Sequence, residues 1–259
     1  MGNQKGKGHM AKNHPACTKP LYGRTEWIIL AGLLVLAASI SAVLLPWAGH
    51  RFYRRPEPPL PFLEAQDTPG WELVLVNPWN RLPEGYQAPL QGLGGGEQID
   101  RRCYGALQDM LDGCRAAGME PLICSAYRSQ DTQERLFAGQ VELWTSQGVS
   151  LEEARAEAGK VVAVPGTSEH QLGLAVDIVD ITNQILDESQ ENTPTQQWLM
   201  ENSWKYGFIL RYPNEKSGIT GIIYEPWHYR YVGKEAAAEI YQQGLCLEEY
   251  LETREGTLP

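Results

Sequence analysis

The chain has 259 residues, of which 42% are hydrophobic and 21% are charged, a composition typical of a folded globular protein rather than of a disordered one. Its formal net charge of −10 argues against a nucleic-acid-binding protein, because such a protein needs a basic face to contact the phosphates. The charge is distributed unevenly. The first 49 residues contain five lysines and arginines and one acid, so the rest of the chain is strongly acidic.

An uncharged apolar segment, Trp27–Trp47, follows the basic N-terminal stretch. A helix of this length would span about 30 Å, the thickness of a bilayer core, and a tryptophan at each end is typical of interfacial anchors. Five cationic residues precede the segment and three follow closely, so the positive-inside rule predicts a cytoplasmic N-terminus and an exported remainder. The alternative is a cleaved signal peptide, although the apolar core of such a peptide has only about 7–15 residues.

These features predict four regions: a basic cytoplasmic tail at 1–26, a transmembrane signal anchor at 27–47, a proline-rich linker at 48–70 and one extracytoplasmic domain at 71–259. Four of the five cysteines fall in that domain, namely Cys103, Cys114, Cys124 and Cys246. An even number permits two disulfides in any of three connectivities, and buried free thiols are the alternative.

Within the domain, short apolar runs alternate irregularly with longer runs of helical periodicity. In chain order they predict a strand at 72–77, a helix at 99–117, a strand at 121–126, a helix at 130–148, a helix starting at 151, a strand at 174–179, a helix at 195–206, a β-rich stretch at 219–232 and a helix at 235–243. Because this order lacks regular βαβ alternation, it predicts an α+β fold with helices packed on a mostly antiparallel sheet.

Only two of the five histidines, His170 and His228, lie in the domain. His170 precedes Asp177 by seven residues, and an imidazole nitrogen and a carboxylate oxygen are both good zinc ligands. In a straight strand an odd separation would direct the two side chains to opposite faces. Gly173 can supply the bend that brings them together.

His228 would be a third ligand, in the segment YEPWHYR at 224–230. Three protein ligands leave one position open for water, which is the arrangement of a catalytic zinc site. Glu225 is the natural general base, since a carboxylate near such a site can take a proton from the water. Strand alternation would separate Glu225 from His228, so the chain has to break regular pairing at Pro226.

A third segment, SAYRSQDTQ at 125–133, joins a predicted strand to a predicted helix. Arg128 at this junction could bind a substrate carboxylate or stabilise an oxyanion, and Ser168 could hydrogen-bond the same substrate end. The alternative is that each group is structural, with Asp177 paired to an arginine and Glu225 on the surface. Both histidines of the domain lie in segments that also supply a carboxylate. Residue chemistry alone therefore supports a metal site and the structural alternative about equally.

Six stretches resemble the VanY-like D-alanyl-D-alanine carboxypeptidases, a zinc metallopeptidase group that also includes lysostaphin-type enzymes and the hedgehog domain. They are LVNPWNRLPEGY (75–86), SAYRSQDTQ (125–133), PGTSEHQLGLAVDI (165–178), YGFILRYP (206–213), TGIIYEPWHYRYVG (220–233) and CLEEYL (246–251). The resemblance implies a hedgehog/D,D-peptidase-like fold, one Zn²⁺ ion, and removal of the terminal D-alanine from peptidoglycan stem peptides ending in D-Ala-D-Ala.

Position by position, the resemblance implies that His170, Asp177 and His228 are the zinc ligands, that Glu225 is the catalytic base and that Arg128 binds substrate and transition state. Ser168 and Gln133 fall at substrate-pocket positions. Two alternatives remain at this stage. One is an endopeptidase of the same group that cuts an L-Ala–D-Glu bond or a cross-bridge, and the other is a non-catalytic domain that binds a wall fragment or a protein partner and in which the zinc is structural.

Overall fold

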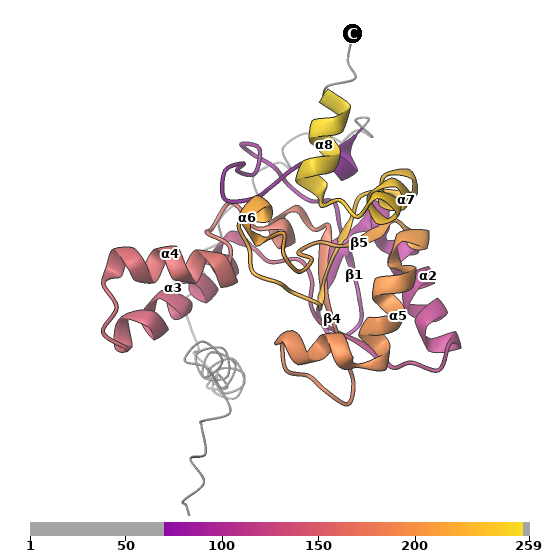
Figure 1. Cartoon of the computed structure of the whole chain (residues 1–259), viewed down its shortest axis with the longest axis horizontal. Coiled ribbons are helices and arrows are strands. Elements are labelled where there is room, and N and C mark those ends of the chain that lie inside the picture. Colours follow the sequence, from indigo (N-terminus) through magenta and orange to yellow (C-terminus); the bar gives the residue numbers. More distant parts are fainter. Residues whose placement is uncertain (1–69, 256–259) are drawn as a thin grey trace, which may run out of the picture.

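The computed structural model describes residues 70–255 (Figure 1). Their core is a four-stranded antiparallel sheet in the order β3-β4-β6-β5. The strands are β3 (Pro121–Ser125), β4 (Ala175–Asp180), β6 (His228–Tyr231) and β5 (Phe208–Leu210). A separate antiparallel pair, β1 (Leu90–Gly92) and β2 (Gln98–Asp100), precedes them in the chain. The predicted α+β fold with an antiparallel sheet is confirmed.

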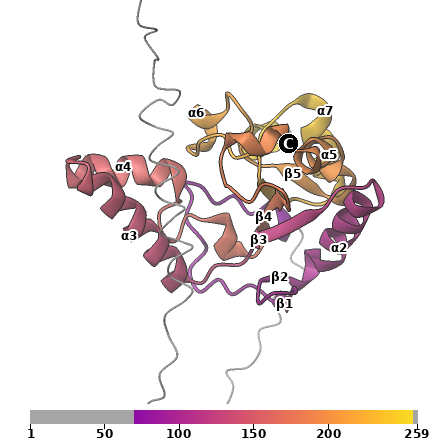
Figure 2. The same ribbon diagram turned by 90° about the horizontal axis from the view of Figure 1, so that it is seen from below.

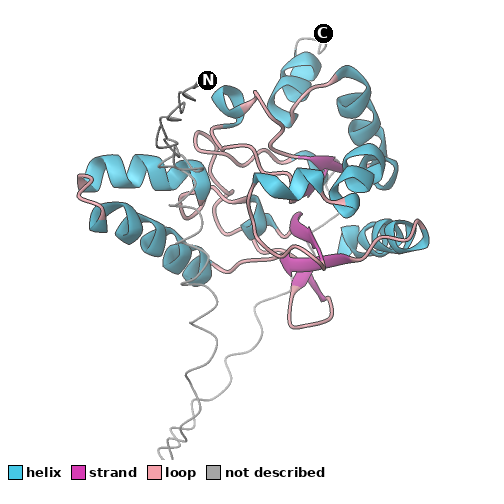
Figure 3. Cartoon of the chain, turned by 60° about the horizontal axis from the view of Figure 1, so that its bottom comes forward, coloured by secondary structure: helices cyan, strands magenta, loops and turns pink. Residues whose placement is uncertain are grey.

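Seven α-helices and four 3-10 helices are found between residues 70 and 255 (Figure 3). The α-helices are α2 (Arg101–Ala116), α3 (Gln130–Ser146), α4 (Leu151–Val161), α5 (Pro194–Asn202), α6 (Ser217–Thr220), α7 (Lys234–Gln243) and α8 (Leu247–Glu255). The 3-10 helices are η1 (Trp71–Leu73), η2 (Glu169–Leu172), η3 (Glu188–Asn192) and η4 (Ser203–Tyr206). Helices α3 and α4 pack on each other and project from one side, whereas α2, α5 and α7 lie on the other side (Figure 2).

Helix α2 illustrates why these elements form. The Asp100 side chain accepts a hydrogen bond from the Arg102 amide and caps the helix, and Gly118, at φ 88°, follows its last turn. Its buried residues recur at helical spacing and form one stripe, Cys103, Leu107, Met110, Leu111 and Cys114. This stripe belongs to the main hydrophobic core together with Val176, Ile178 and Tyr229 of the sheet.

The two inner strands, β4 and β6, present an apolar face and a polar face. Val176 pairs with Tyr229 on the face that packs into the core, where the Tyr229 hydroxyl donates to Gln196 of α5. Asp177 pairs with His228 on the opposite face, as the two-residue period of a strand requires. The sheet therefore packs apolar side chains into the core on one face and carries the side chains of Asp177 and His228 on the other.

One of the predicted elements is wrong and a second is confirmed only in part. Residues 72–77 form no regular strand, and only η1 and an isolated bridge at Asn77 are found there. The carbonyls of Glu72 and Val74 accept hydrogen bonds from the Arg230 side chain instead of from a neighbouring strand. The β-rich stretch at 219–232 contributes only β6, because Gly221, at φ 77°, ends α6 and a turn at Pro226 delays the strand.

The four cysteines of the described chain are free thiols, and Cys103, Cys114 and Cys246 are buried. Among residues 70–255, no helix is long and apolar enough to cross a membrane. The anchor predicted at 27–47 lies outside the described residues, as do the tail at 1–26 and nearly all of the linker at 48–70.

Candidate metal centre

His170 and Asp177 come together through a left-handed turn. His170 lies in η2, whose C-terminal cap is Gly173 at φ 73°, and the chain then enters β4, which carries Asp177. Few residues other than glycine adopt this backbone conformation, and a Cβ at position 173 would lie 3.2 Å from the Ala88 Cβ. The bend predicted at Gly173 is therefore confirmed.

His228 reaches the same place from the other inner strand. It is the first residue of β6 and the direct register partner of Asp177. Before it, Pro226 and Trp227 form a turn in which the His228 amide donates to the Glu225 carbonyl. This turn places the Glu225 Oε2 atom 3.5 Å from the His228 Nδ1 atom, so the break predicted at Pro226 is also confirmed.

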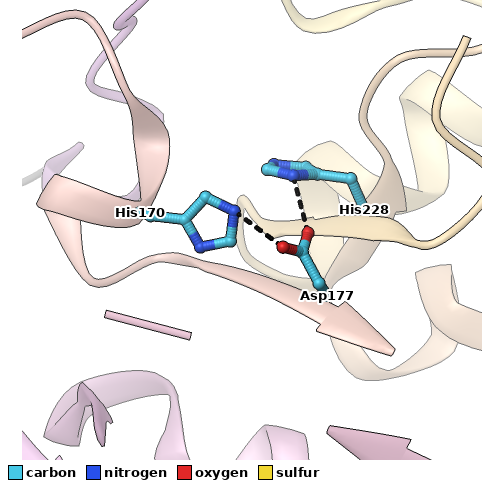
Figure 4. Close-up of side chains that lie close together, drawn as sticks. All are labelled: His170, Asp177 and His228. Atoms are coloured by element: carbon cyan, nitrogen blue, oxygen red, sulfur yellow. Dashed lines mark ion pairs between the residues drawn. The ribbon is translucent and has the colours of Figure 1, made fainter. Parts of the chain in front are cut away.

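The three predicted ligands offer donor atoms that lie within 4.8 Å of one another, and all three residues are buried. The His170 Nε2 atom is 3.3 Å from Asp177 Oδ2, and the His228 Nδ1 atom is 3.1 Å from Asp177 Oδ1 (Figure 4). Two ligands of one tetrahedral zinc ion, each bound at about 2.0–2.1 Å, lie about 3.3 Å apart. The spacing of the donors therefore fits a zinc ion.

The hydrogen bonds around the donors favour the same conclusion. The His170 Nδ1–H group donates to the Ala126 carbonyl at 2.6 Å, which leaves the Nε2 lone pair directed at Asp177. Asp177 Oδ1 is buried and forms no hydrogen bond within the described part of the chain. That unpaired oxygen faces His228 Nδ1 at 3.1 Å in a buried site, where a cation bound to both atoms would satisfy them.

Burial strongly affects the ionisable groups of this centre. Burial, aided by Arg128, lowers the pKa of His170 to about 4, so its imidazole is neutral and able to bind a metal. Burial opposes ionisation of Asp177, yet His170 and Arg128 together hold its pKa well below the usual range. Burial also raises the pKa of Glu225 to about 8, which suits a group that exchanges a proton near neutral pH.

Arg128 lies between β3 and α3, as predicted, and contacts the centre directly. Its Nη2 atom is 2.6 Å from Asp177 Oδ2, and its Nε–H group donates to the Ser125 hydroxyl. Asp177 is thus paired with an arginine, as the structural alternative supposed, but its second oxygen remains for a metal. A bulge between Ile123 and Ser125 in the β3–β4 pairing leads the chain into this position.

A cavity of about 430 Å³ opens beside the three donors. Arg128, Ser168 and Glu225 line it together with the three donors, and much of the remaining wall is apolar, including Tyr127, Leu136, Ile222, Ile223 and Trp227. Gln133 does not line it. Its buried side chain instead donates to the carbonyl of Ala163, which is a wall residue. Any effect of Gln133 on a substrate would therefore pass through Ala163.

A group of buried charges directly behind the centre was not predicted from the sequence. Glu169 Oε1 accepts hydrogen bonds from Arg211 Nε and Arg230 Nη1, both at 2.7 Å, and Arg211 also pairs with Glu248. All four residues are at most 8% exposed. The available signal was the position of Glu169 directly before His170, and of the two arginines in stretches of otherwise apolar and aromatic residues.

A buried His–Asp–His set with a carboxylate beside it, on the wall of a cavity, is the arrangement of a catalytic metal centre. The family model described as VanY, D-alanyl-D-alanine carboxypeptidase, matches residues 96–234. The D-alanyl-D-alanine carboxypeptidase of Enterococcus faecalis (strain ATCC 700802 / V583) is 50% identical over 190 residues, covering 73% of this chain and 69% of that protein. The chain belongs to the VanY family of D-alanyl-D-alanine carboxypeptidases.

Two solved structures resemble the described fold. VanYB in complex with D-alanine-D-alanine matches with a TM-score of 0.66 and 49% identity, over 71% of this chain and 98% of that chain. The second is a mutant of the vancomycin resistance D,D-pentapeptidase VanY, from a VanB-type resistance cassette and in complex with Zn(II). It matches with a TM-score of 0.64 and 48% identity, over 70% of this chain and 99% of that chain. The same family therefore includes members solved with zinc and with the dipeptide.

Proposed function

We propose that the chain is a zinc-dependent D,D-carboxypeptidase that hydrolyses the terminal D-Ala-D-Ala bond of peptidoglycan stem peptides or their precursors. The observation that carries the proposal is the convergence of His170 Nε2, His228 Nδ1 and the carboxylate of Asp177 at zinc-ligand spacing in a buried site. Membership of the VanY family supplies the substrate class.

In this proposal His170, Asp177 and His228 hold one zinc ion. When bound, the ion would lower the pKa of a water ligand and polarise the scissile carbonyl. Glu225 accepts a proton from the attacking water at Oε2 and passes it to the leaving amine of D-alanine. Its burial keeps bulk water away and holds the carboxyl group close to the reacting atoms.

The substrate end is seated by the polar wall of the cavity. Arg128 can donate to the terminal carboxylate of the peptide while its Nη2 atom keeps the contact with Asp177. Ser168 lines the same cavity, and its hydroxyl can serve as a second donor. Gln133 supports this wall by fixing the Ala163 carbonyl.

The decisive experiment incubates the full-length chain with a muramyl pentapeptide that ends in D-Ala-D-Ala, with and without a chelator. Free D-alanine that appears only in the metal-loaded sample supports the proposal. Dipeptide products would indicate the endopeptidase alternative, and binding without turnover would indicate the non-catalytic alternative.

Replacement of the base separates catalysis from metal binding. Glu225→Ala should lower kcat/KM by at least ~100-fold, because general acid–base catalysis contributes about 10²–10⁴-fold. The variant should retain zinc, because Glu225 is not among the three predicted ligands. Full activity of the zinc-loaded variant would disprove this mechanism.

We further propose that 27–47 anchors the protein in a bacterial cell membrane, with the N-terminus in the cytoplasm and the domain outside. The support is the uncharged apolar length and the excess of cationic residues before it. In intact spheroplasts, added protease should digest the domain and leave an N-terminal tag protected. A mature chain that lacks 1–47 would instead indicate a cleaved signal peptide.

A further inference from the structure

Glu169 joins the metal centre to the buried charges behind it. It lies in η2 directly before His170, and it is 1% exposed. Its two carboxylate oxygens have different surroundings. Oε1 accepts from both Arg211 and Arg230, whereas Oε2 forms no hydrogen bond within the described residues.

This unpaired oxygen lies 3.5 Å from the Nε2 atom of His228. That nitrogen is also buried, and it too forms no hydrogen bond between residues 70 and 255. A carboxylate oxygen can only accept, so the pair forms a hydrogen bond only if the proton of the imidazole is on Nε2. Leaving both buried atoms unpaired would destabilise the fold, because each has lost its hydrogen bonds to water.

We propose that Glu169 is a positioning residue that keeps the His228 proton on Nε2, so that Nδ1 is the atom that binds the metal. The inference rests on the proposed zinc site and adds to it a residue outside the ligand set. His170 is oriented in the opposite sense, because the Ala126 carbonyl holds its proton on Nδ1 and leaves Nε2 free. The two histidines thus ligate through different nitrogens, each selected by an acceptor behind the ring.

Arg211 and Arg230 determine which Glu169 oxygen faces His228. Both guanidinium groups donate to Oε1, which fixes that oxygen on the arginine side and directs Oε2 toward the imidazole. In the variant Glu169→Gln, the amide oxygen must occupy the Oε1 position, because an amide NH₂ cannot accept from the arginines. The NH₂ group then faces His228 Nε2 as a donor and moves the imidazole proton to Nδ1, where the metal should bind.

Glu169→Gln should therefore lower the zinc affinity of the full-length chain by ~10–100-fold, the range seen for residues that support metal ligands. Affinity is measured by competition with a chromophoric chelator at a temperature where the metal-free variants are folded. The matched control is Glu248→Gln, which alters a buried carboxylate of the same charge cluster whose hydrogen bonds go to Arg211 and Asn77. Both variants should unfold at lower temperature, but only the first should lose zinc affinity in this range.

Equal zinc affinity in Glu169→Gln and the wild-type chain, or an equal loss in the two variants, would overturn the proposal. If Glu169→Gln does not fold, ¹⁵N NMR of the zinc-loaded wild-type chain tests the same point. A protonated Nε2 and a metal-bound Nδ1 on His228 support the proposal, and the reverse pattern overturns it. A wild-type chain that binds no zinc would instead contradict the proposed function, so the two failures can be distinguished.

Discussion

Two neighbouring groups of buried polar side chains differ in how completely they are paired. In the rear cluster, which we define as Arg211, Arg230 and Glu248, every guanidinium nitrogen donates a hydrogen bond and both Glu248 oxygens accept one. In the metal centre, Asp177 Oδ1 faces His228 Nδ1 at 3.1 Å and has no hydrogen-bond partner among the described residues. Unpaired buried polar atoms lower the stability of a fold. The rear cluster therefore needs no further partner, whereas the metal centre needs a ligand.

The largest effect should follow from removal of a donor of the metal centre. His228→Gln keeps a buried side chain of similar size, and its amide can donate to Glu169, but it lacks the imidazole nitrogen that faces Asp177. Loss of a ligand should reduce zinc affinity by more than the ~10–100-fold typical of supporting residues. Hydrolysis of the pentapeptide should fall to the level of the chelated wild-type chain.

The metal-free His228→Gln chain should unfold at nearly the urea concentration of the metal-free wild type, because the glutamine amide can still donate to Glu169 and Asp177 Oδ1 has no hydrogen bond to lose. Chelator competition and urea unfolding monitored by circular dichroism measure the two quantities separately. Wild-type zinc affinity in this variant would contradict the assignment of His228 as a ligand.

The rear cluster should show the opposite pattern. Arg211→Met removes the guanidinium that pairs with Glu169 and Glu248, all of them buried, and leaves two carboxylates short of a partner. Breaking a buried ion pair from one side costs about 3–5 kcal/mol, so the free energy of unfolding of the metal-free chain should fall by about that amount. Urea unfolding at constant pH measures the change.

Lys216→Met is the matched control for that variant, because it also removes a cation that pairs with a glutamate of α8. The Lys216–Glu249 pair is partly exposed, so its loss should hardly shift the urea midpoint. If the two variants lost equal stability, burial would not be what distinguishes the rear cluster from a surface pair.

The metal centre and the rear cluster also differ in how far they could be predicted from the sequence. Residue types with intrinsic metal chemistry identified His170, Asp177 and His228, and elementary strand geometry required a bend at Gly173 and a break at Pro226. Helix α2 could be predicted for a similar reason, because apolar spacing is a local signal. The helix, the bend and the break depend on residues close together in the chain, whereas His228 was identified by its residue type alone.

The missed features depend on distant contacts. The strand predicted at 72–77 failed because Arg230, far along the chain, binds the carbonyls that a strand would have used. Glu169 resembles a surface acid in the sequence, because no neighbouring residue indicates that Arg211 and Arg230 pair with it. An arginine partner for Asp177 was among the alternatives, but the sequence did not identify it as Arg128, which lies 49 positions away.

The smallest effect that we predict concerns the glycine turn beside the metal centre. A second glycine with a similar backbone conformation, away from the centre, serves as the control. Gly173→Ala and Gly244→Ala both place a Cβ on a residue with positive φ, 73° and 66°, and each should lose about 1–2 kcal/mol of stability from this conformation. Only the Cβ at 173 meets neighbours, at 3.2 Å from Ala88 and 3.3 Å from the Asp100 amide, whereas the one at 244 has open space.

Because Gly173 sets the angle between His170 and Asp177, its replacement should also weaken zinc binding, and the Gly244 variant should bind zinc like the wild type. Chelator competition at a temperature where both variants are folded tests this difference. If both variants lost stability and neither lost zinc affinity, the turn would be a requirement of folding alone, and the position of His170 would have to be fixed by its hydrogen bond to Ala126.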